Sequence, residues 1–238
     1  LRSVIDQQVQ NVATFTALAR LVKERLALDV AELDPSAVHY MGISNGGTQG
    51  LTIMATSPEL TRGALVVPGG GWTHMIQRAV QFGELGALVQ DRFPSALDFQ
   101  LALAALQMVF DPVDSLNYAD VLLDRPEVEV TLHMAVHDSQ VANLVTEWVA
   151  RTAGIPLIEP ATVSIPGLPT VGTSPGGRAA LFVYDEGVAA APPGNQPPAV
   201  DNGTHDTVRR LEAYQVQVGA FLESGLIQQV CDGACDPE

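Results

Sequence analysis

Residues 37–50 read AVHYMGISNGGTQG, a short apolar run that passes through Gly42-Ile43-Ser44-Asn45-Gly46 into a segment able to form a helix. A serine in this setting has the sequence form of a nucleophile elbow, a sharp turn between a strand and a helix. Gly42 and Gly46 would give the turn room, because glycine has no Cβ to collide with the neighbouring chain. The same pattern also describes an ordinary glycine–serine turn, so the flanking elements must decide between the two.

The rest of the chain alternates between strand-like and helix-like segments. Apolar runs predict strands at 38–41, 63–68, 128–136 and 179–184. Apolar residues at helical spacing predict helices at 1–28, 45–55, 72–124, 143–153 and 206–224. Strands that alternate with helices predict an α/β fold, with a mostly parallel sheet of about four strands and helices on both of its faces.

The composition fits one globular domain and disfavours some partners. At 238 residues the chain can bury a sizeable core as a single domain spanning 1–238. Its 27 acidic and 12 basic residues give a formal net charge of −15, which repels nucleic acids and anionic membranes. We identify no apolar run of transmembrane length and therefore expect no transmembrane segment.

A serine nucleophile needs a base to accept its proton and an acid to orient that base. After Ser44, Asp138 follows the third predicted strand and His205 precedes the last helix. These positions fit the order of serine, acid and histidine on loops at the carboxyl ends of strands. Asp138 is therefore the predicted acid and His205 the predicted base. Asp185 and Glu186, after the next strand, are competing acids, and Asp138 can also serve as a simple helix cap.

The other four histidines have different predicted roles. His39 and His133 lie in strand patterns and are expected to be packed or edge residues of the sheet. His137 can neighbour the site, but it precedes the predicted acid in the chain and so does not fit as the base. His74 follows a Gly-Gly-Gly-Trp loop, and we predict that Trp72 and His74 line the substrate pocket.

The negative oxygen formed during acyl transfer needs two or more hydrogen-bond donors. The backbone N–H of Asn45, next to the serine, is predicted to be one of them. The second normally comes from a loop far upstream, and one helix alone precedes the predicted elbow strand here. We therefore expect the chain to be the C-terminal part of a larger catalytic domain whose N-terminal strands are missing. An upstream segment of the same protein would supply the second donor.

Cys231 and Cys235 are the two cysteines of the chain. The glycine-containing spacer between them can close a small disulfide loop, and disulfides persist in oxidising compartments. Two free thiols are the alternative. A metal site is not expected, because no histidine or further cysteine lies nearby in the sequence.

Several stretches together resemble the α/β-hydrolase superfamily, and more narrowly the bacterial extracellular lipases and esterases that include virulence-factor-type lipases. Besides residues 42–47, the similar stretches are DPVDSLNYA (111–119), DSQVAN (138–143), GTH (203–205) and QVQVGAFL (215–222). The sequence departs from that group at Asn45, where its lipases usually have leucine, and at Ala142, where proline is typical. The resemblance implies carboxylic ester substrates, no cofactor, and a secreted or cell-surface location.

These observations predict a serine hydrolase that cleaves a small-molecule or lipid ester through Ser44, His205 and Asp138. Residues 72–124, inserted between two predicted strands, are expected to form a helical cap over an apolar acyl pocket. A peptidase or an acyltransferase that uses the same three residues is an alternative, because the chemistry at the triad is shared. A catalytically silent, hydrolase-like fragment or binding module is another.

Overall fold

The structure is a computed structural model that describes residues 2–236. Its centre is one sheet of six strands in the order β1-β2-β3-β6-β4-β5. The strands are β1 Tyr40–Ile43, β2 Arg62–Val66, β3 Glu129–Ala135, β4 Leu157–Ile158, β5 Thr170–Val171 and β6 Ala179–Tyr184. Each pair of neighbouring strands is parallel. The expected α/β fold with a mostly parallel sheet is therefore confirmed.

Two short strands were not predicted. β4 and β5 have two residues each and extend the sheet to six strands, so the expectation of a four-stranded sheet was wrong. β4 joins the sheet through the pair of Leu157 with Leu181 of β6. A two-residue segment is too short to show an alternating pattern, which takes about four residues to recognise. Only the pairing with a longer strand makes these residues part of the sheet.

Helices occupy the segments that were predicted to be helical. The first, α1 Arg2–Leu21, continues through the π-helical turn η1 Val22–Leu26 and α2 Ala27–Asp29. The others are α3 Asn45–Thr56, α4 Trp72–Arg78, η2 Val80–Phe82, α5 Gly83–Arg92, α6 Ala96–Phe110, η3 Asp111–Val113, η4 Ser115–Tyr118, α7 Asn143–Ala153, α8 Thr204–Thr207, η5 Val208–Arg210 and α9 Glu212–Ser224. Gly225 adopts a φ of +78° at the end of α9, a conformation that commonly terminates a helix.

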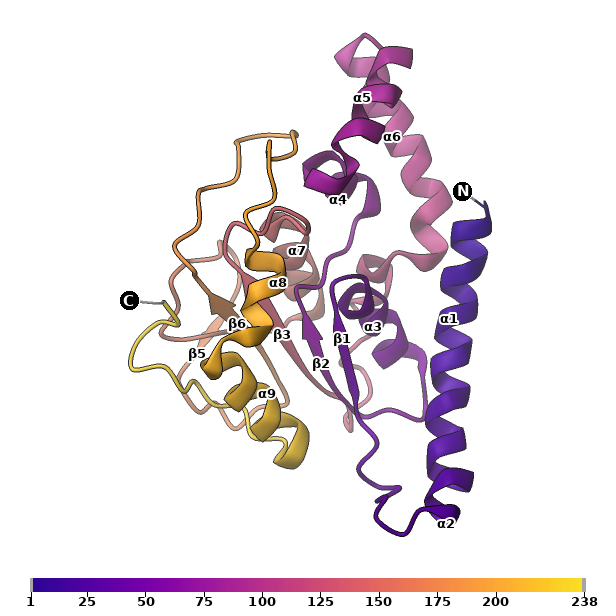
Figure 1. The fold of residues 1–238 in the computed structure, drawn as a ribbon, viewed down its shortest axis with the longest axis vertical. Coiled ribbons are helices and arrows are strands. Elements are labelled where there is room, and N and C mark those ends of the chain that lie inside the picture. Colours follow the sequence, from indigo (N-terminus) through magenta and orange to yellow (C-terminus); the bar gives the residue numbers. More distant parts are fainter. Residues whose placement is uncertain (1, 237–238) are drawn as a thin grey trace.

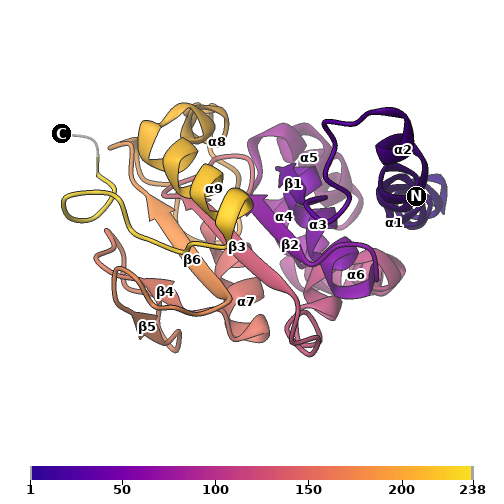
Figure 2. The ribbon, with the colours of Figure 1, turned by 90° about the horizontal axis from the view of Figure 1, so that it is seen from below.

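The two faces of the sheet are covered by different helices (Figure 2). Along β6, Leu181 and Val183 belong to the core that includes α3 and α7, whereas Phe182 and Tyr184 belong to the core that includes α9. This alternation follows from the period of two along a strand. Because both faces of β6 are buried, its sequence is a continuous apolar run rather than an alternating one.

Helix α1 lies along α3 at one side of the molecule (Figure 1). Its buried residues are Gln8 and Ala19. By contrast, Val4, Phe15 and Leu18 of the predicted apolar stripe are 45%, 40% and 49% exposed. The amphipathic pattern thus predicted the helix correctly, but much of its apolar face is at the surface within the described residues. The helix contacts the body through a narrower strip than the pattern suggests.

The residues between β2 and β3 are helical, and α4, α5 and α6 project beyond the carboxyl ends of the strands (Figure 1). The segment Ala96–Val113, which comprises α6 and η3, is long and apolar enough by length and composition to cross a membrane, and it is mostly exposed. The expectation that the sequence holds no apolar run of this length was therefore wrong. That the chain has no transmembrane segment stays a prediction.

Candidate active site

Three neighbouring strands are followed by backbone in a strained conformation. Ser44, Val67 and His137 come after β1, β2 and β3 and have φ angles of +58°, +42° and +59°. Among residues 2–236 they are the positive-φ positions that are not glycine. Such conformations cost about 1–3 kcal/mol each and gather at functional sites. The carboxyl edge of the sheet is therefore where chemistry is expected.

Ser44 occupies the turn between β1 and α3. Its N–H donates to the backbone oxygen of Val66 at 2.9 Å, which ties the turn to the neighbouring strand. A Cβ added to Gly42 would lie 2.2 Å from the backbone oxygen of Gly46, and one added to Gly47 would lie 2.7 Å from that of Val66. Both distances are shorter than real Cβ contacts allow. The strand, the strained serine, the helix and the required glycines together form the turn that the sequence predicts.

Asp138 and His205 form a buried pair. His205 Nδ1 lies 2.7 Å from Asp138 Oδ2, and the His205 and Asp138 side chains are 4% and 1% exposed. The other oxygen, Asp138 Oδ1, accepts from the backbone N–H groups of Gln140 and Val141 at 2.8 and 2.9 Å. Because the backbone holds one oxygen, the second is directed at the imidazole. A carboxylate placed in this way selects the histidine tautomer that carries its proton on Nδ1.

The competing acids have other partners. Asp185 accepts from the backbone N–H of Gly187 at 2.9 Å. Glu186 accepts from two threonine hydroxyls of α8 at 2.6 and 2.9 Å and so holds that short helix. Neither carboxylate is bonded to His205. Of the three candidate acids, Asp138 is therefore the one that contacts the predicted base, His205.

Asp201, which the sequence analysis did not single out, joins the loop of the acid to the loop of the histidine. Its carboxylate accepts from Ser139 Oγ at 2.6 Å and from Gln140 Nε2 at 2.7 Å. It also accepts from the backbone N–H of Gly203 at 3.0 Å. These hydrogen bonds, above all the one from Ser139, lower the pKa of Asp201 below its usual value. A carboxylate that stays charged therefore links the two loops.

Ser44 lies at the same edge of the sheet but is not bonded to the pair. It follows β1 and Asp138 comes shortly after β3, with β2 between these two strands. Within residues 2–236 the side-chain hydrogen bond of His205 is the one to Asp138. Catalytic hydrogen bonds are often long in structures without substrate. The structure therefore brings the acid and the histidine together, and within the described residues it contains no hydrogen bond between His205 and Ser44.

The predicted oxyanion donor, the backbone N–H of Asn45, lies directly after Ser44 at the start of α3. Asn45 is the first residue of α3, so its N–H has no partner within the helix. The glycine loop after β2 offers less: Gly69 N donates to a threonine hydroxyl of α3 at 2.9 Å, and Gly71 N and Trp72 N each donate to Asp114 at 2.8 Å. These three N–H groups of the loop are therefore already engaged.

Asp114 links the start of α4 to the end of α6, a role that its sequence context did not reveal. The residue is completely buried. Its two oxygens accept four hydrogen bonds of 2.7–3.0 Å, from Gly71 N, Trp72 N, Leu116 N and Gln107 Nε2. These bonds join the start of α4 and the end of α6 to the loop after β2. Asp114 belongs to a stretch that supports the family resemblance, which was the one available signal.

We expect Asp114→Asn to lower the free energy of unfolding by about 2–3 kcal/mol, because an amide NH₂ cannot accept and leaves buried N–H groups without partners. Urea unfolding followed by circular dichroism measures the change. Asp111→Asn is the matched control: this exposed carboxylate accepts from Gln107 Nε2 at 3.1 Å, and we expect a change within about 0.5 kcal/mol. Equal losses in the two variants would contradict the role given to Asp114.

Trp72 and His74, the predicted pocket residues, have different surroundings. Trp72 stacks on Phe110 with ring centroids 5.5 Å apart and lines a cavity of about 530 Å³ among α4, α5 and α6. His74 packs edge-on against Trp148 with centroids 4.9 Å apart and does not line that cavity. Burial lowers the pKa of His74 below its usual value. Of the two, only Trp72 faces the apolar cavity.

His133 is a packed core residue, as its strand pattern suggested. Its ring nitrogens lie 2.9 Å from Tyr184 OH and 3.0 Å from Thr131 Oγ1, and burial lowers its pKa to about 3, so the ring is neutral. His39, just before β1, is half-buried, and its pKa is also lowered by burial.

Cys231 and Cys235 are joined by a disulfide, with Cα atoms 5.4 Å apart. Cys235 is buried and forms a β-bridge with Tyr184 at the end of β6. The disulfide loop therefore lies against the sheet rather than on a free tail.

No protein-family model matches the chain, and no curated protein matches it. Among solved structures it is similar to an esterase from Pyrococcus furiosus, at 13% identity and a TM-score of 0.47, covering 89% of this chain and 60% of that one. A puromycin hydrolase is similar at 14% identity and a TM-score of 0.47, with coverages of 92% and 26%. An acylaminoacyl peptidase from Pyrococcus horikoshii is similar at 11% identity and a TM-score of 0.46, with coverages of 88% and 27%.

The chain spans from 26% to 60% of the length of these structures. Likenesses of this degree do not by themselves establish a fold. The class of fold follows from the molecule itself. It has a parallel sheet, a strained serine between a strand and a helix, and an acid and a histidine later in the chain. This is the arrangement of the α/β-hydrolase fold.

Proposed function

We propose that the protein is a serine hydrolase that cleaves carboxylic esters through Ser44, His205 and Asp138. The observation that carries the proposal is the buried contact of 2.7 Å between His205 Nδ1 and Asp138 Oδ2, at the sheet edge where Ser44 is held at a strained φ of +58°. An imidazole oriented by a buried carboxylate is the base that a serine hydroxyl needs.

In the proposed reaction, Ser44 Oγ forms a bond to the ester carbonyl carbon while His205 Nε2 takes the hydroxyl proton. The carbonyl oxygen becomes an oxyanion and is stabilised by the Asn45 N–H. The intermediate then breaks its bond to the alcohol oxygen, which leaves with the proton from His205. A water molecule attacks the resulting acyl-enzyme, again with His205 as the base, and the carboxylic acid is released. Asp138 stays charged and stabilises the imidazolium at each proton transfer.

The cavity among α4, α5 and α6 is the reason to expect an apolar group on the substrate. Its cavity of about 530 Å³ has the size of a small-molecule site and is lined mainly by aromatic and aliphatic side chains. They include Trp72, Phe82, Phe99, Leu103 and Phe110. We propose that residues 72–124 act as a cap and that this cavity takes the acyl chain of the ester. Burial in this cavity would stabilise an aliphatic chain, because its apolar surface leaves water. Burial would destabilise a charged group, because the group would lose its hydration.

The proposal includes a second oxyanion donor from an upstream segment of the same protein. The need for such a donor is supported by the N–H groups of Gly69, Gly71 and Trp72, because each of them already donates to a side chain. We further propose that the protein is exported to the cell surface or secreted. The disulfide between Cys231 and Cys235 supports this, because disulfides persist in oxidising compartments.

One observation favours a second candidate, a catalytically silent hydrolase-like module. The Ser44 side chain makes no hydrogen bond to His205 in the described structure, so the base is oriented but not engaged. A peptidase or acyltransferase would use the same three residues, and substrate profiling separates these from an esterase.

Labelling with a fluorophosphonate probe tests the proposed nucleophile. We expect the probe to modify Ser44 in the folded chain, as identified by peptide mass spectrometry, and to leave Ser44→Ala unmodified. Ser174→Ala, which removes an exposed serine from a loop, should be labelled like the wild type. Hydrolysis of p-nitrophenyl esters but not of aminoacyl p-nitroanilides would then favour an esterase. An unlabelled Ser44 in a chain with cooperative thermal unfolding would support the silent module instead.

A further inference from the structure

The helix that carries His205 is too short to hold its own position. α8 has four residues, Thr204–Thr207, and Gly203 precedes it with a φ of +84°. A helix of a single turn fixes several backbone angles in return for very few hydrogen bonds, so it is not stable by itself. The position of His205 therefore depends on the contacts that α8 makes with the rest of the molecule.

Glu186 holds α8 from the carboxyl end of β6. Its Oε1 accepts from Thr204 Oγ1 at 2.6 Å and from Thr207 Oγ1 at 2.9 Å. Thr204 is completely buried and directly precedes His205 in the chain. The hydroxyl of Thr207 can instead donate to Gly203 O, which lies 3.1 Å away. Because a hydroxyl has one proton to donate, the bond from Thr204 is the one that Glu186 does not share with Gly203.

The backbone next to Glu186 is itself held in place. Tyr184, the last residue of β6, is completely buried and pairs with Ala135 of β3. Tyr184 also forms a β-bridge with Cys235, and Asp185 N donates to Cys235 O at 2.9 Å. A residue that positions another group needs such support, because its own backbone must stay in place. Glu186 therefore connects α8 to a strand end that is paired on both sides.

Asp138 and Glu186 hold His205 in different ways. Asp138 contacts the ring at Nδ1 and so selects its tautomer. One hydrogen bond at Nδ1 leaves the ring free to pivot about that bond. Glu186 does not contact the ring; it acts through Thr204 on the backbone that carries the ring. Two contacts, one on the ring and one on the backbone beside it, define the position of the imidazole better than either contact alone.

We propose that Glu186 is a positioning residue for the base: through Thr204 it fixes α8, so that His205 Nε2 is held toward Ser44 during acyl transfer. This role rests on the proposed function, because it takes His205 as the base. Both threonine hydroxyls are bonded to a single oxygen, Oε1, so Glu186 supplies an acceptor at a fixed place. An amide oxygen at that place would serve equally well, and this separates Glu186 from an orienting acid such as Asp138.

Glu186→Met and Glu186→Gln test whether the acceptor matters. Methionine removes the acceptor from an unbranched side chain, whereas glutamine keeps Oε1. We expect Glu186→Met to lower kcat for a p-nitrophenyl ester about 10- to 100-fold, since a misplacement of about 1 Å can cost about 10²-fold. KM should stay within about twofold, because neither Glu186 nor α8 lines the cavity in the cap. Glu186→Gln should stay within about threefold of the wild type, because its amide oxygen still accepts both bonds.

Glu223→Met is the matched control for the lost charge, because it makes the same change at an exposed position of α9; it should keep the wild-type kcat. Thermal unfolding of each variant sets a common assay temperature at which every chain is folded. A wild-type kcat in Glu186→Met would overturn the proposal. Equal losses in Glu186→Met and Glu186→Gln would also overturn it, because they would show that the charge of Glu186 matters and not its place.

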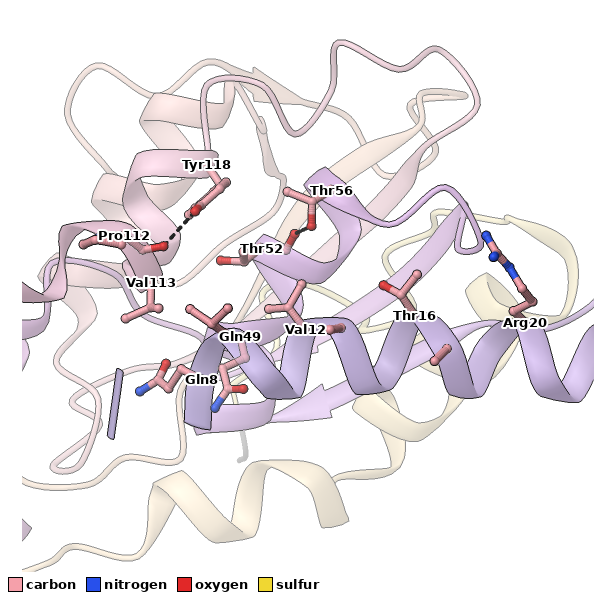
Figure 3. A pocket seen from close by; sticks show the side chains of 13 residues that line it. Gln8, Val12, Thr16, Arg20, Gln49, Thr52, Thr56, Pro112, Val113 and Tyr118 are labelled. Carbon is pink, nitrogen blue, oxygen red and sulfur yellow. Dashed lines mark hydrogen bonds between the residues drawn. The ribbon is translucent and has the colours of Figure 1, made fainter. Parts of the chain in front are cut away.

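Thr204→Val tests the same contact from the side of α8 with little change in volume. We expect kcat to fall about tenfold, the effect of one lost hydrogen bond. Combined with Glu186→Met, it should cause no further loss, since both changes remove one interaction. Thr56→Val is the matched control: Thr56 Oγ1 also donates at 2.6 Å, to Thr52 O beside the groove between α1 and α3 (Figure 3), and kcat should be unchanged. Additive losses in the combined variant would contradict the proposed link.

Nuclear magnetic resonance of histidine ring protons separates failure of this role from failure of the proposed function. The side chains of His205 and Asp138 are 4% and 1% exposed, so the Nδ1–H proton between them should exchange slowly and give a resonance at low field. We expect this resonance in the wild type and in Glu186→Gln, and its loss in Glu186→Met, where a looser α8 admits water. The measurement needs no turnover and holds even if a fluorophosphonate leaves Ser44 unlabelled. An unchanged resonance in Glu186→Met would overturn the positioning role.

Discussion

Asp138→Asn is expected to lower the rate of acyl transfer from an ester about 10⁴-fold, the size of effect that a misoriented triad histidine produces. The asparagine keeps Oδ1, which accepts from Gln140 N and Val141 N. It replaces Oδ2 by an NH₂ group, which donates to His205 Nδ1 instead of accepting from it. The imidazole must then carry its proton on Nε2, where it can no longer take a proton from Ser44.

The measurement is kcat/KM for a p-nitrophenyl ester, together with the rate of fluorophosphonate labelling at Ser44. Asp185→Asn is the matched control. This competing acid follows the next strand, and within residues 2–236 its carboxylate accepts from Gly187 N at 2.9 Å and not from His205. We expect its rates within about twofold of the wild type, since a group outside the site adds no transition-state contact. A rate for Asp138→Asn within tenfold of the wild type would exclude Asp138 as the orienting acid.

Gly42→Ala is expected to disrupt the turn that carries the nucleophile. The new Cβ would lie 2.2 Å from Gly46 O and 2.7 Å from Tyr40 Cε1. Because the closest atom is backbone, the clash is relieved only by moving β1 away from α3. We expect the free energy of unfolding to fall by about 3 kcal/mol, the upper part of the usual range for overpacking. The rate of fluorophosphonate labelling at Ser44 should also decrease, because the same turn carries the serine.

Gly219→Ala makes the same substitution where no atom lies within 4 Å of the new Cβ. Gly219 is exposed in the middle of α9, so alanine should raise the free energy of unfolding by about 0.5–1 kcal/mol, through its better helix propensity. Urea unfolding of both variants measures the two changes. If Gly42→Ala unfolded at the wild-type urea concentration, the close approach at the elbow would not constrain the fold.

The sequence was most informative where chemistry depends on local patterns. Helix α7 and strand β6 have the boundaries that were predicted, 143–153 and 179–184. The turn at Ser44 was predicted from glycine positions, because the room that glycine provides is a local property. The order of Ser44, Asp138 and His205 likewise follows from the chain, since parallel strands bring their carboxyl ends to one edge of a sheet.

Sequence reasoning failed where contacts come from distant parts of the chain. Asp114 and Asp201 hold loops through hydrogen bonds to residues as many as 62 positions away, and no short motif marks such partners. The apolar stripe of α1 predicted a helix but not how little of that stripe is buried. β4 is recognised as a strand only because it pairs with β6 in the folded chain.

The sequence by itself determined the class of fold, the strained serine turn and the order of the three proposed catalytic residues. These depend on residue volume, on backbone freedom and on the periods of strands and helices, which act over a few residues. Only the tertiary structure decided that Asp138, rather than Asp185 or Glu186, contacts His205. The physical reason is that a hydrogen bond or a cavity between segments depends on how helices and strands pack, and this packing is a property of the whole folded chain.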